Sequence, residues 1–140
     1  MAILPDVNVW LAMAFQTHVH HESAKAWLAA IESPIFFCRL TQQGLLRIAC
    51  NPKVFGADAV TLGQAWELYD AFQTDERIAY LDEPADLETK WRQLTENGST
   101  KPNVWSDAYL AAFSIAAGLK VVTFDRDFLR FEGLDANLLT

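Results

Sequence analysis

Short apolar runs alternate with amphipathic segments along the whole chain, and this alternation restricts the fold more than any other feature. The runs of strand length cover residues 3–4, 35–38, 78–81 and 120–124. Strands that alternate with helices favour a mostly parallel sheet covered by helices on both faces. We therefore predict an α/β fold, a three-layer α/β/α domain built around a mostly parallel four- or five-stranded sheet.

The segments between the runs are predicted to be helical from the spacing of their apolar residues and from cap residues. They cover residues 7–15, 21–31, 40–50, 62–72, 84–98 and 106–118. Thr61 and Gln64 form a capping-box pattern, and Ser106 is expected to cap the last helix. The same spacing predicts core packing for three tryptophans, which are Trp27, Trp66 and Trp91.

The chain is long enough to build its own core. Its 140 residues, 51% of them hydrophobic, fit a single domain over residues 1–140 that needs neither a disulfide nor a structural metal. Cys38 and Cys50 lack the spacing of a metal site and are expected to be buried thiols of a reducing compartment. The uncharged stretch at residues 108–119 is too short for a membrane span, and no basic leader is visible, so we expect a cytoplasmic protein.

Acidic residues outnumber basic ones. Eighteen Asp and Glu residues against eleven Lys and Arg residues give a formal net charge of −7. A surface of this charge argues against a protein that coats nucleic acid or anionic lipid. It leaves room for a local site at which a metal ion neutralises the acids.

Three aspartates fall where a parallel α/β fold places its sites. Asp6 follows the first apolar run, Asp125 follows the last, and Asp107 lies in the first turn of the helix that leads into that last run. Sites in such folds form beyond the carboxyl ends of the strands, so the three acids are expected to converge at one edge. Each also has a simpler interpretation, because Asp6 and Asp107 suit helix caps and Asp125 suits a turn.

The order and spacing of several motifs resemble the PIN-domain ribonucleases, and among them the VapC toxins of bacterial toxin–antitoxin pairs. The matching stretches of the first half cover residues 4–12, 20–24, 39–42 and 46–47. Those of the second half are stronger and cover residues 106–112 and 122–128, the latter similar to the family's T-x-D-x-D-F ending. The resemblance extends from Ile3 to about Leu134.

This resemblance implies a metal-dependent endoribonuclease in which Asp6, Asp107 and Asp125 are catalytic and hold Mg²⁺ or Mn²⁺. It implies water attack on a phosphodiester, with 5′-phosphate and 3′-hydroxyl products. It also implies a homodimer that a small VapB-like antitoxin neutralises. The physical chemistry agrees on the metal, because hard divalent cations take oxygen ligands and lower the pKa of bound water.

Polar residues near the three acids suit supporting roles. The amides of Asn8 and Asn103 are placed to orient a carboxylate or a water, and the Thr123 hydroxyl matches a hydroxyl position of the family. Asp127 either assists through a water or only caps the turn. Ordinary loop capping and a plain strand threonine are the simpler interpretations of Asn8, Asn103 and Thr123.

Basic residues close in sequence to the acids are candidates for holding phosphates beside the metal. They are Arg39, Arg47, Lys101 and Arg126. The simpler interpretation of each is solvated surface charge. Because the net charge is negative, affinity for RNA must come from such a local patch and from the metal, so we expect one structured RNA as the substrate.

One departure from the family concerns a glutamate that commonly follows the second strand. Its position falls within residues 41–45, on Gly44, and no acid occurs between Ile35 and Ala57. Gln43 is a weak substitute. If position 44 faces the acids, replacing Gly44 by Glu is expected to tighten Mn²⁺ binding and to lower the stability of the metal-free protein.

Two other functions fit parts of the sequence less well. The missing glutamate favours a catalytically inactive PIN-like binding module. A phosphotransfer or phosphatase domain that uses Asp6 needs an Asp-x-Asp pair or a partner Lys near the first strand, which Val7 and Asn8 do not supply. The histidines at positions 18, 20 and 21 lack the spacing of a zinc site and are expected to be structural or solvated. A metal-dependent ribonuclease is the function that the sequence favours.

Overall fold

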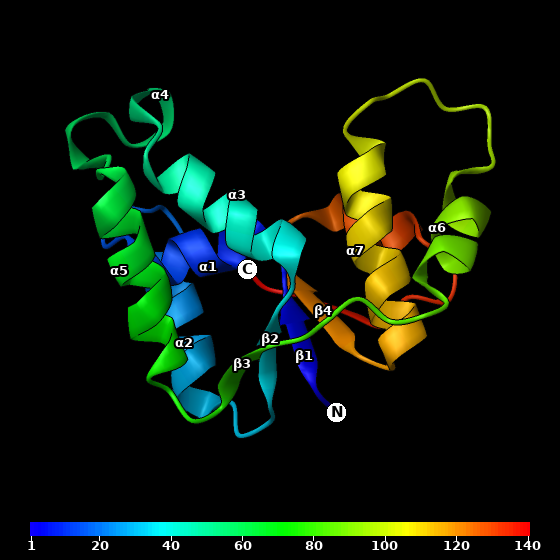
Figure 1. The fold of residues 1–140 in the computed structure, drawn as a ribbon, viewed down its shortest axis with the longest axis horizontal. Coiled ribbons are helices and arrows are strands. Elements are labelled where there is room, and N and C mark those ends of the chain that lie inside the picture. Colours follow the sequence, from blue (N-terminus) through cyan, green and yellow to red (C-terminus); the bar gives the residue numbers. More distant parts are fainter.

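The computed structural model describes residues 1–140 and has one five-stranded sheet at its centre (Figure 1). The strands are β1 (Ile3–Pro5), β2 (Ile35–Phe37), β3 (Ile78–Tyr80), β4 (Lys120–Thr123) and β5 (Ala136–Leu138). Their order across the sheet is β3-β2-β1-β4-β5, and every neighbouring pair is parallel. The predicted parallel α/β/α fold is confirmed, in its five-stranded form.

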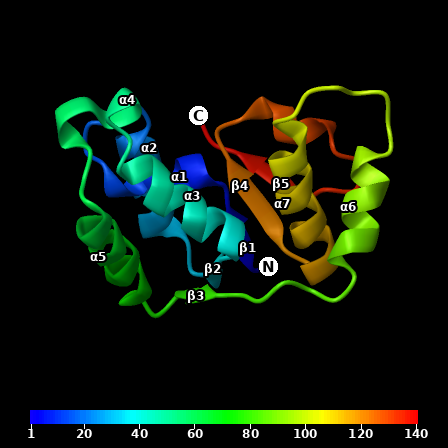
Figure 2. The ribbon, with the colours of Figure 1, turned by 45° about the horizontal axis from the view of Figure 1, so that its top comes forward.

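Helices connect the strands and form two groups. The α-helices are α1 (Val7–Ala14), α2 (His21–Ala30), α3 (Arg39–Ala49), α4 (Pro52–Phe55), α5 (Leu62–Gln73), α6 (Leu87–Thr95) and α7 (Val104–Ala117), and the 3₁₀ turns are η1 (Gly56–Asp58) and η2 (Arg126–Arg130). Helices α6 and α7 lie on one side of the sheet, and α1, α2, α3 and α5 lie on the other (Figures 1 and 2). Both faces of the sheet are therefore covered by helices.

Successive side chains of the central strands enter different hydrophobic clusters, as the alternation of a strand requires. Leu4 and Val121 pack with α6 and α7, whereas Ile3 and Val122 pack with Val9 of α1. All of these side chains are buried. The near-continuous apolar runs of β1 and β4 are thus explained by burial on both faces.

The register of β1 and β4 brings their carboxyl ends to the same edge. Pro5 pairs with Val122, and the backbone N–H of Asp6 donates to the carbonyl of Val122 over 2.9 Å. The chain leaves β1 into α1 at that point, and it leaves β4 into η2. This edge is where the sequence predicted a site.

Two helix starts differ from the prediction. Helix α6 begins at Leu87, because Pro84 only opens a turn whose carbonyl accepts from the N–H of Leu87 over 3.2 Å. Helix α7 begins at Val104, so Ser106 lies inside the helix and is not its cap. The chain turns into α7 earlier because Trp105 already donates its N–H to the carbonyl of Pro102 over 3.2 Å.

The other local predictions are mostly confirmed. Thr61 and Gln64 form the predicted capping box of α5. Trp27 and Trp91 pack against the core, but Trp66 of α5 is 51% exposed, so its predicted core packing is wrong. Cys38 is buried and Cys50 only partly so, and both are free thiols. None of the helices combines the length and apolar character that a bilayer crossing needs.

Candidate functional site

Asp6 is held by both of its carboxylate oxygens at the end of β1. Oδ1 accepts from the N–H of Val7 over 2.7 Å and thereby caps α1, and Oδ2 accepts from the hydroxyl of Thr123 over 3.1 Å. Burial raises the pKa of this carboxyl above its ordinary value, and the nearby charge of Asp125 raises it further. Asp6 is therefore a helix cap and also part of an acidic group.

Thr123 links the ends of β1 and β4. Its buried hydroxyl donates to Asp6 and accepts from the backbone N–H of Asp125 over 2.9 Å. Asp125 in turn accepts the N–H of Asp127 over 2.9 Å and caps η2. One strand threonine thus fixes one acid directly and the backbone of another, as the sequence suggested for this hydroxyl.

Asp107 lies in the first turn of α7 and approaches the same edge from the other side. Its pKa is raised to about 6, first by burial and then by the negative charges of Asp6 and Asp125. Arg130 opposes this shift through a 3.4 Å contact with Oδ2 of Asp107. The three predicted acids therefore lie near the same edge of the sheet, close enough for the charges of Asp6 and Asp125 to raise the pKa of Asp107.

Asp6 and Asp107 face a common cleft of about 220 Å³ between α3 and the first turn of α7. Its other lining residues are Val7, Leu40, Thr41, Gln43, Gly44, Arg47, Ile48, Ser106, Leu110 and Phe128. Asp125 and Thr123 do not line the cleft. They lie behind it at the end of β4, where Thr123 bonds to both Asp6 and the backbone of Asp125. The cleft is small and half of its lining residues are polar, which suits a phosphate group and an ion better than a bulky apolar ligand.

Gly44 lines the cleft, but its missing side chain would not point into free space. A Cβ built there would lie 2.5 Å from Cγ2 of Val7, which is too close without a shift. The branched side chain of Val7 therefore fills the room beside Gly44. The expectation that Glu at position 44 would simply add a ligand needs correction, because Val7 must first give way.

The donor set at this edge fits a hard divalent cation. Asp6, Asp107 and Asp125 offer only oxygen atoms, and their like charges raise the pKa values of Asp6 and Asp107. No group of three acid, histidine or cysteine side chains is close enough to form a ready-made cage. Mg²⁺ does not require one, because it is usually held by one or two carboxylates together with waters and phosphate oxygens.

Several residues predicted to assist lie away from the cleft. Asn8 is exposed on α1, and Asn103 is exposed at the start of α7, where its side chain makes no capping hydrogen bond. Asp127 is exposed and contacts Arg130 over 3.8 Å. The structure therefore brings Thr123 to the acids and leaves these three residues outside the cleft.

The four predicted basic residues occupy different places. Arg47 lines the cleft itself. Arg39 donates to Gln42 over 2.6 Å, packs over the ring of Tyr80 and lines a neighbouring hollow. Lys101 is exposed in the loop before α7, and Arg126 is exposed at the start of η2. Only Arg47 is placed directly beside Asp6 and Asp107.

The sequence did not single out Arg130, although it is the cation closest to the acids. It lies at the end of η2, and a 3₁₀ turn that places Asp127 and Arg130 together also directs Arg130 toward Asp107. The histidines behave as expected: the Nδ1–H of His21 donates to the carbonyl of Ala12 over 2.7 Å, and His20 stacks on Phe124.

Comparison with known families and proteins adds an independent finding. The PIN domain family matches the chain over residues 3–134. The chain is 45% identical to Ribonuclease VapC41 of Mycobacterium tuberculosis, over 98% of both chains. It is 30% identical to Ribonuclease VapC38 of the same organism, over 89% of this chain and 85% of that protein.

Solved structures share the fold at low sequence identity. A structure of VapBC2 from Rickettsia felis, bound to a DNA fragment from its promoter, superposes with a TM-score of 0.76 at 17% identity and full coverage of both chains. VapC20 of Mycobacterium tuberculosis, a toxin that cleaves the sarcin-ricin loop, superposes with a TM-score of 0.64 at 19% identity, over 95% of this chain and 98% of that chain.

Proposed function

The chain belongs to the PIN-domain family, among the VapC ribonucleases, and on this premise we propose that it is a metal-dependent endoribonuclease toxin. Asp6, Asp107 and Asp125 form its catalytic site. The observation that carries this proposal is the acidic cleft, in which burial and like charges raise the pKa of Asp107 to about 6. Carboxylates whose pKa values are raised by burial and by like charges cluster at functional sites, because their repulsion costs stability.

Each residue of the cleft has a definite task in this proposal. Asp6 and Asp107 hold Mg²⁺ or Mn²⁺, and Asp125 adds negative charge from the end of β4. Such a cation, when bound, lowers the pKa of water at the site and offsets the negative charge that develops on the phosphodiester. Thr123 keeps the Asp6 carboxylate in a fixed orientation through its 3.1 Å hydrogen bond.

Two arginines complete the site. Arg47 lines the cleft and offers its guanidinium to a phosphate oxygen, a contact that positions RNA without reading its sequence. Arg130 contacts Asp107 and restrains the direction of that carboxylate. Because the net charge is −7, these local cations and the metal supply the electrostatic attraction for RNA.

We further propose that the substrate is a structured RNA and that a small antitoxin inhibits the enzyme, which acts as a homodimer. Structural neighbours support the antitoxin, because VapBC complexes from Rickettsia felis and Salmonella typhimurium share the fold of this chain, with TM-scores of 0.76 and 0.67. VapC20, which cleaves the sarcin-ricin loop, supports a structured substrate.

The second candidate function is an inactive PIN-like module that binds RNA without cleaving it. The observation in its favour is the pair formed by Gly44 and Val7, which leaves the cleft with one acid fewer than the family commonly has. Cleavage assays separate the two functions, because the module would bind RNA and leave it intact.

The test is cleavage of end-labelled structured RNAs by the purified protein with Mg²⁺ or Mn²⁺, with and without EDTA. We expect cleavage only with the free metal, and a loss of about 100-fold or more in Asp6→Asn and Asp107→Asn. Asp75→Asn, which removes an acid on the far side of the fold, is the matched control and retains the wild-type rate. Cleavage that persists in EDTA would contradict the metal mechanism.

A further inference from the structure

Trp105 is an exposed aromatic residue beside the acidic cleft that the proposed chemistry does not use. It lies in the first turn of α7, two residues before Asp107, and 59% of it is exposed. Tryptophan has one of the largest apolar surfaces of any side chain, and leaving that surface in water is unfavourable. An exposed tryptophan next to a functional site therefore indicates that a ligand covers it.

The neighbours of Trp105 hold its backbone and leave its ring accessible. The indole N–H of Trp91 donates to the carbonyl of Trp105 over 3.1 Å. The two rings meet edge to face, with centroids 5.9 Å apart and planes at 83°. Trp91 also packs edge to face on Tyr109, whose hydroxyl donates to Glu83 over 2.8 Å. Trp105 is thus presented on a rigid support.

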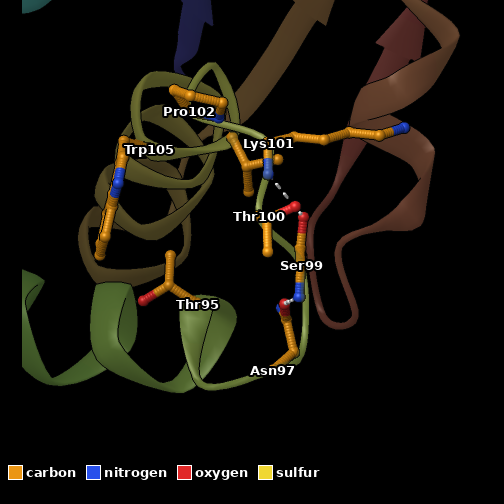
Figure 3. Close-up of a pocket in the computed structure, with 8 residues that line it drawn as sticks. Thr95, Asn97, Ser99, Thr100, Lys101, Pro102 and Trp105 are labelled. Carbon is orange, nitrogen blue, oxygen red and sulfur yellow. Dashed lines mark hydrogen bonds between the residues drawn. The ribbon is translucent and has the colours of Figure 1, made fainter.

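Three hollows of the surface meet at Trp105. One, of about 400 Å³, shares Leu40, Gln43 and Ser106 with the acidic cleft, so the two are continuous. A second, of about 180 Å³, is formed by Trp105 and the loop that precedes α7 (Figure 3). A third lies between α6 and α7. A ligand seated at Asp6 and Asp107 can therefore extend along the surface to the tryptophan.

We propose that Trp105 is the stacking platform for an unpaired base of the RNA, next to the phosphodiester held at Asp6 and Asp107. The inference rests on the proposed ribonuclease function and names the part of the substrate that this surface binds. Every base has an apolar face that stacks on an aromatic ring, and proteins that bind single-stranded RNA use such platforms beside basic grooves.

Charge indicates the direction in which the strand leaves the cleft. Arg39 lines the hollow that joins Trp105 to the cleft, together with Glu83, which accepts the hydroxyl of Tyr109. Lys101 lines the hollow shown in Figure 3, where its side chain extends away from Trp105. The hollow between α6 and α7 carries Glu88 and Glu96, and its one cation, Arg92, is already paired with Glu88 over 3.1 Å. Phosphates on either side of the stacked base therefore lie toward Arg39 and Lys101, and not toward α6.

The loop before α7 offers polar groups next to the tryptophan. The side-chain oxygen of Asn97 accepts from the N–H of Ser99 over 2.8 Å, and the hydroxyl of Ser99 accepts from the N–H of Lys101 over 3.3 Å (Figure 3). The amide nitrogen of Asn97 donates to the carbonyl of Leu94 over 3.3 Å, so these bonds shape the loop and leave the Thr100 hydroxyl in the lining of the hollow. Such a group can bind the edge of a splayed-out base.

Trp66 provides the matched control within the same molecule. It is 51% exposed and also borders a hollow next to the cleft, of about 480 Å³, but that hollow is lined mainly by aliphatic side chains. They are Leu46, Leu62 and Ala65. Its polar members are Gln43 and Arg47, which also line the cleft, whereas the hollow beside Trp105 has a whole loop of polar side chains. The two tryptophans are therefore expected to differ in RNA binding.

The experiment measures fluorescence anisotropy of a fluorescein-labelled 12-nucleotide single-stranded RNA in EDTA at low salt, so that binding is seen without cleavage. We expect Trp105→Ala to weaken binding about 10-fold or more, and Trp105→Phe to retain most of it because a ring remains. Trp66→Ala stays within twofold of the wild type. The same RNA annealed to its complement binds more weakly to the wild type and is insensitive to Trp105→Ala.

Folding and self-association are checked on the same samples. Trp105→Phe keeps an aromatic ring against Trp91. If it binds RNA while Trp105→Ala does not, the loss of affinity comes from the missing ring and not from unfolding. Equal affinities of wild type and Trp105→Ala, or an equal loss in Trp66→Ala, would overturn the proposal. So would a halved mass of Trp105→Ala in light scattering, because Trp105 would then lie between two copies of the chain. If metal-dependent cleavage by the wild type persists in these cases, the proposed function still stands.

Discussion

Two acidic regions of this molecule behave in opposite ways. Asp75, in the turn before β3, receives hydrogen bonds from the backbone and the guanidinium of Arg77, and these bonds lower its pKa to about 2. Asp6 and Asp107, at the carboxyl ends of the strands, have raised pKa values because they are buried near other acids. Thus Asp75 has a cation as a close partner, whereas the negative charges of Asp6 and Asp107 are only weakly balanced.

The difference shows which acids serve the fold. Arg77 also donates to the carbonyls of Leu28 and Ile31, over 2.7 Å for Leu28, so the Asp75–Arg77 pair ties α2 to the turn before β3. The acids of the cleft have no comparable cation, since Arg130 reaches Asp107 only at 3.4 Å. We infer that the paired region contributes stability, whereas the buried like charges of the cleft lower it.

The largest effect on stability is expected from a variant that adds volume and charge at position 44. Gly44→Glu places a Cβ against Val7 and a further carboxylate beside the cleft, so it lowers the free energy of unfolding by about 1–3 kcal/mol through overpacking alone. Thermal melts in EDTA measure the effect. Gly44→Ala is the control, because it adds the Cβ without the charge.

The companion variant removes the obstacle. Val7→Ala combined with Gly44→Glu relieves the contact and lets the new carboxylate join the cleft. The double variant is expected to bind Mn²⁺ more tightly than the wild type in calorimetric titration, because an added oxygen ligand favours a hard cation. If Gly44→Glu alone is as stable as the wild type, the placement of Val7 in this account is wrong.

A smaller effect separates the two acidic regions directly. Asp75→Asn is expected to lower the free energy of unfolding by about 1 kcal/mol, because it weakens a partly exposed ion pair. Asp107→Asn is expected to leave the melting midpoint unchanged or to raise it, since it removes a repelled charge. Melts of both variants in EDTA at pH 7.5 test this. A lower midpoint in Asp107→Asn would mean that Asp107 is mainly structural.

The smallest effect is the pH dependence of the metal-free protein. Asp107 has a pKa of about 6 in the folded state against an ordinary value of 3.8, so the folded protein binds the proton more tightly. The destabilisation is complete above pH 6 and disappears as the pH falls toward 4. We expect a higher melting midpoint at pH 5 than at pH 7.5 in EDTA, and a smaller difference in Asp107→Asn. Asp75 does not interfere, because its stabilisation is lost only below about pH 4.

Much of the fold was predictable from the sequence because local signals and tertiary packing agree. The apolar runs of β1 and β4 are buried on both faces, and Asp6 caps α1 directly after its strand. The topology then places Asp6 and Asp125 at one edge, as parallel strands must. The position of Asp6 and Asp125 at one edge of the sheet therefore follows from the sequence pattern alone.

The remaining features depend on contacts between residues distant in sequence. The hydrogen bond from Trp91 to the carbonyl of Trp105 joins two helices, and no local pattern predicts it. The packing of Val7 against Gly44 is also a contact between residues distant in sequence. Because of it, the side chain of Val7 fills the space where the family's glutamate would begin. Spacing along the chain gives no information about such contacts.

We propose that Asp6 and Asp107 form a cation site and that Asp75, which is paired with Arg77, does not. Calorimetric titration of Mn²⁺ into wild type, Asp107→Asn and Asp75→Asn tests it most directly. We predict binding by the wild type, at least tenfold weaker binding by Asp107→Asn, and wild-type affinity for Asp75→Asn. Unchanged affinity in Asp107→Asn, or an equal loss in Asp75→Asn, would contradict the account.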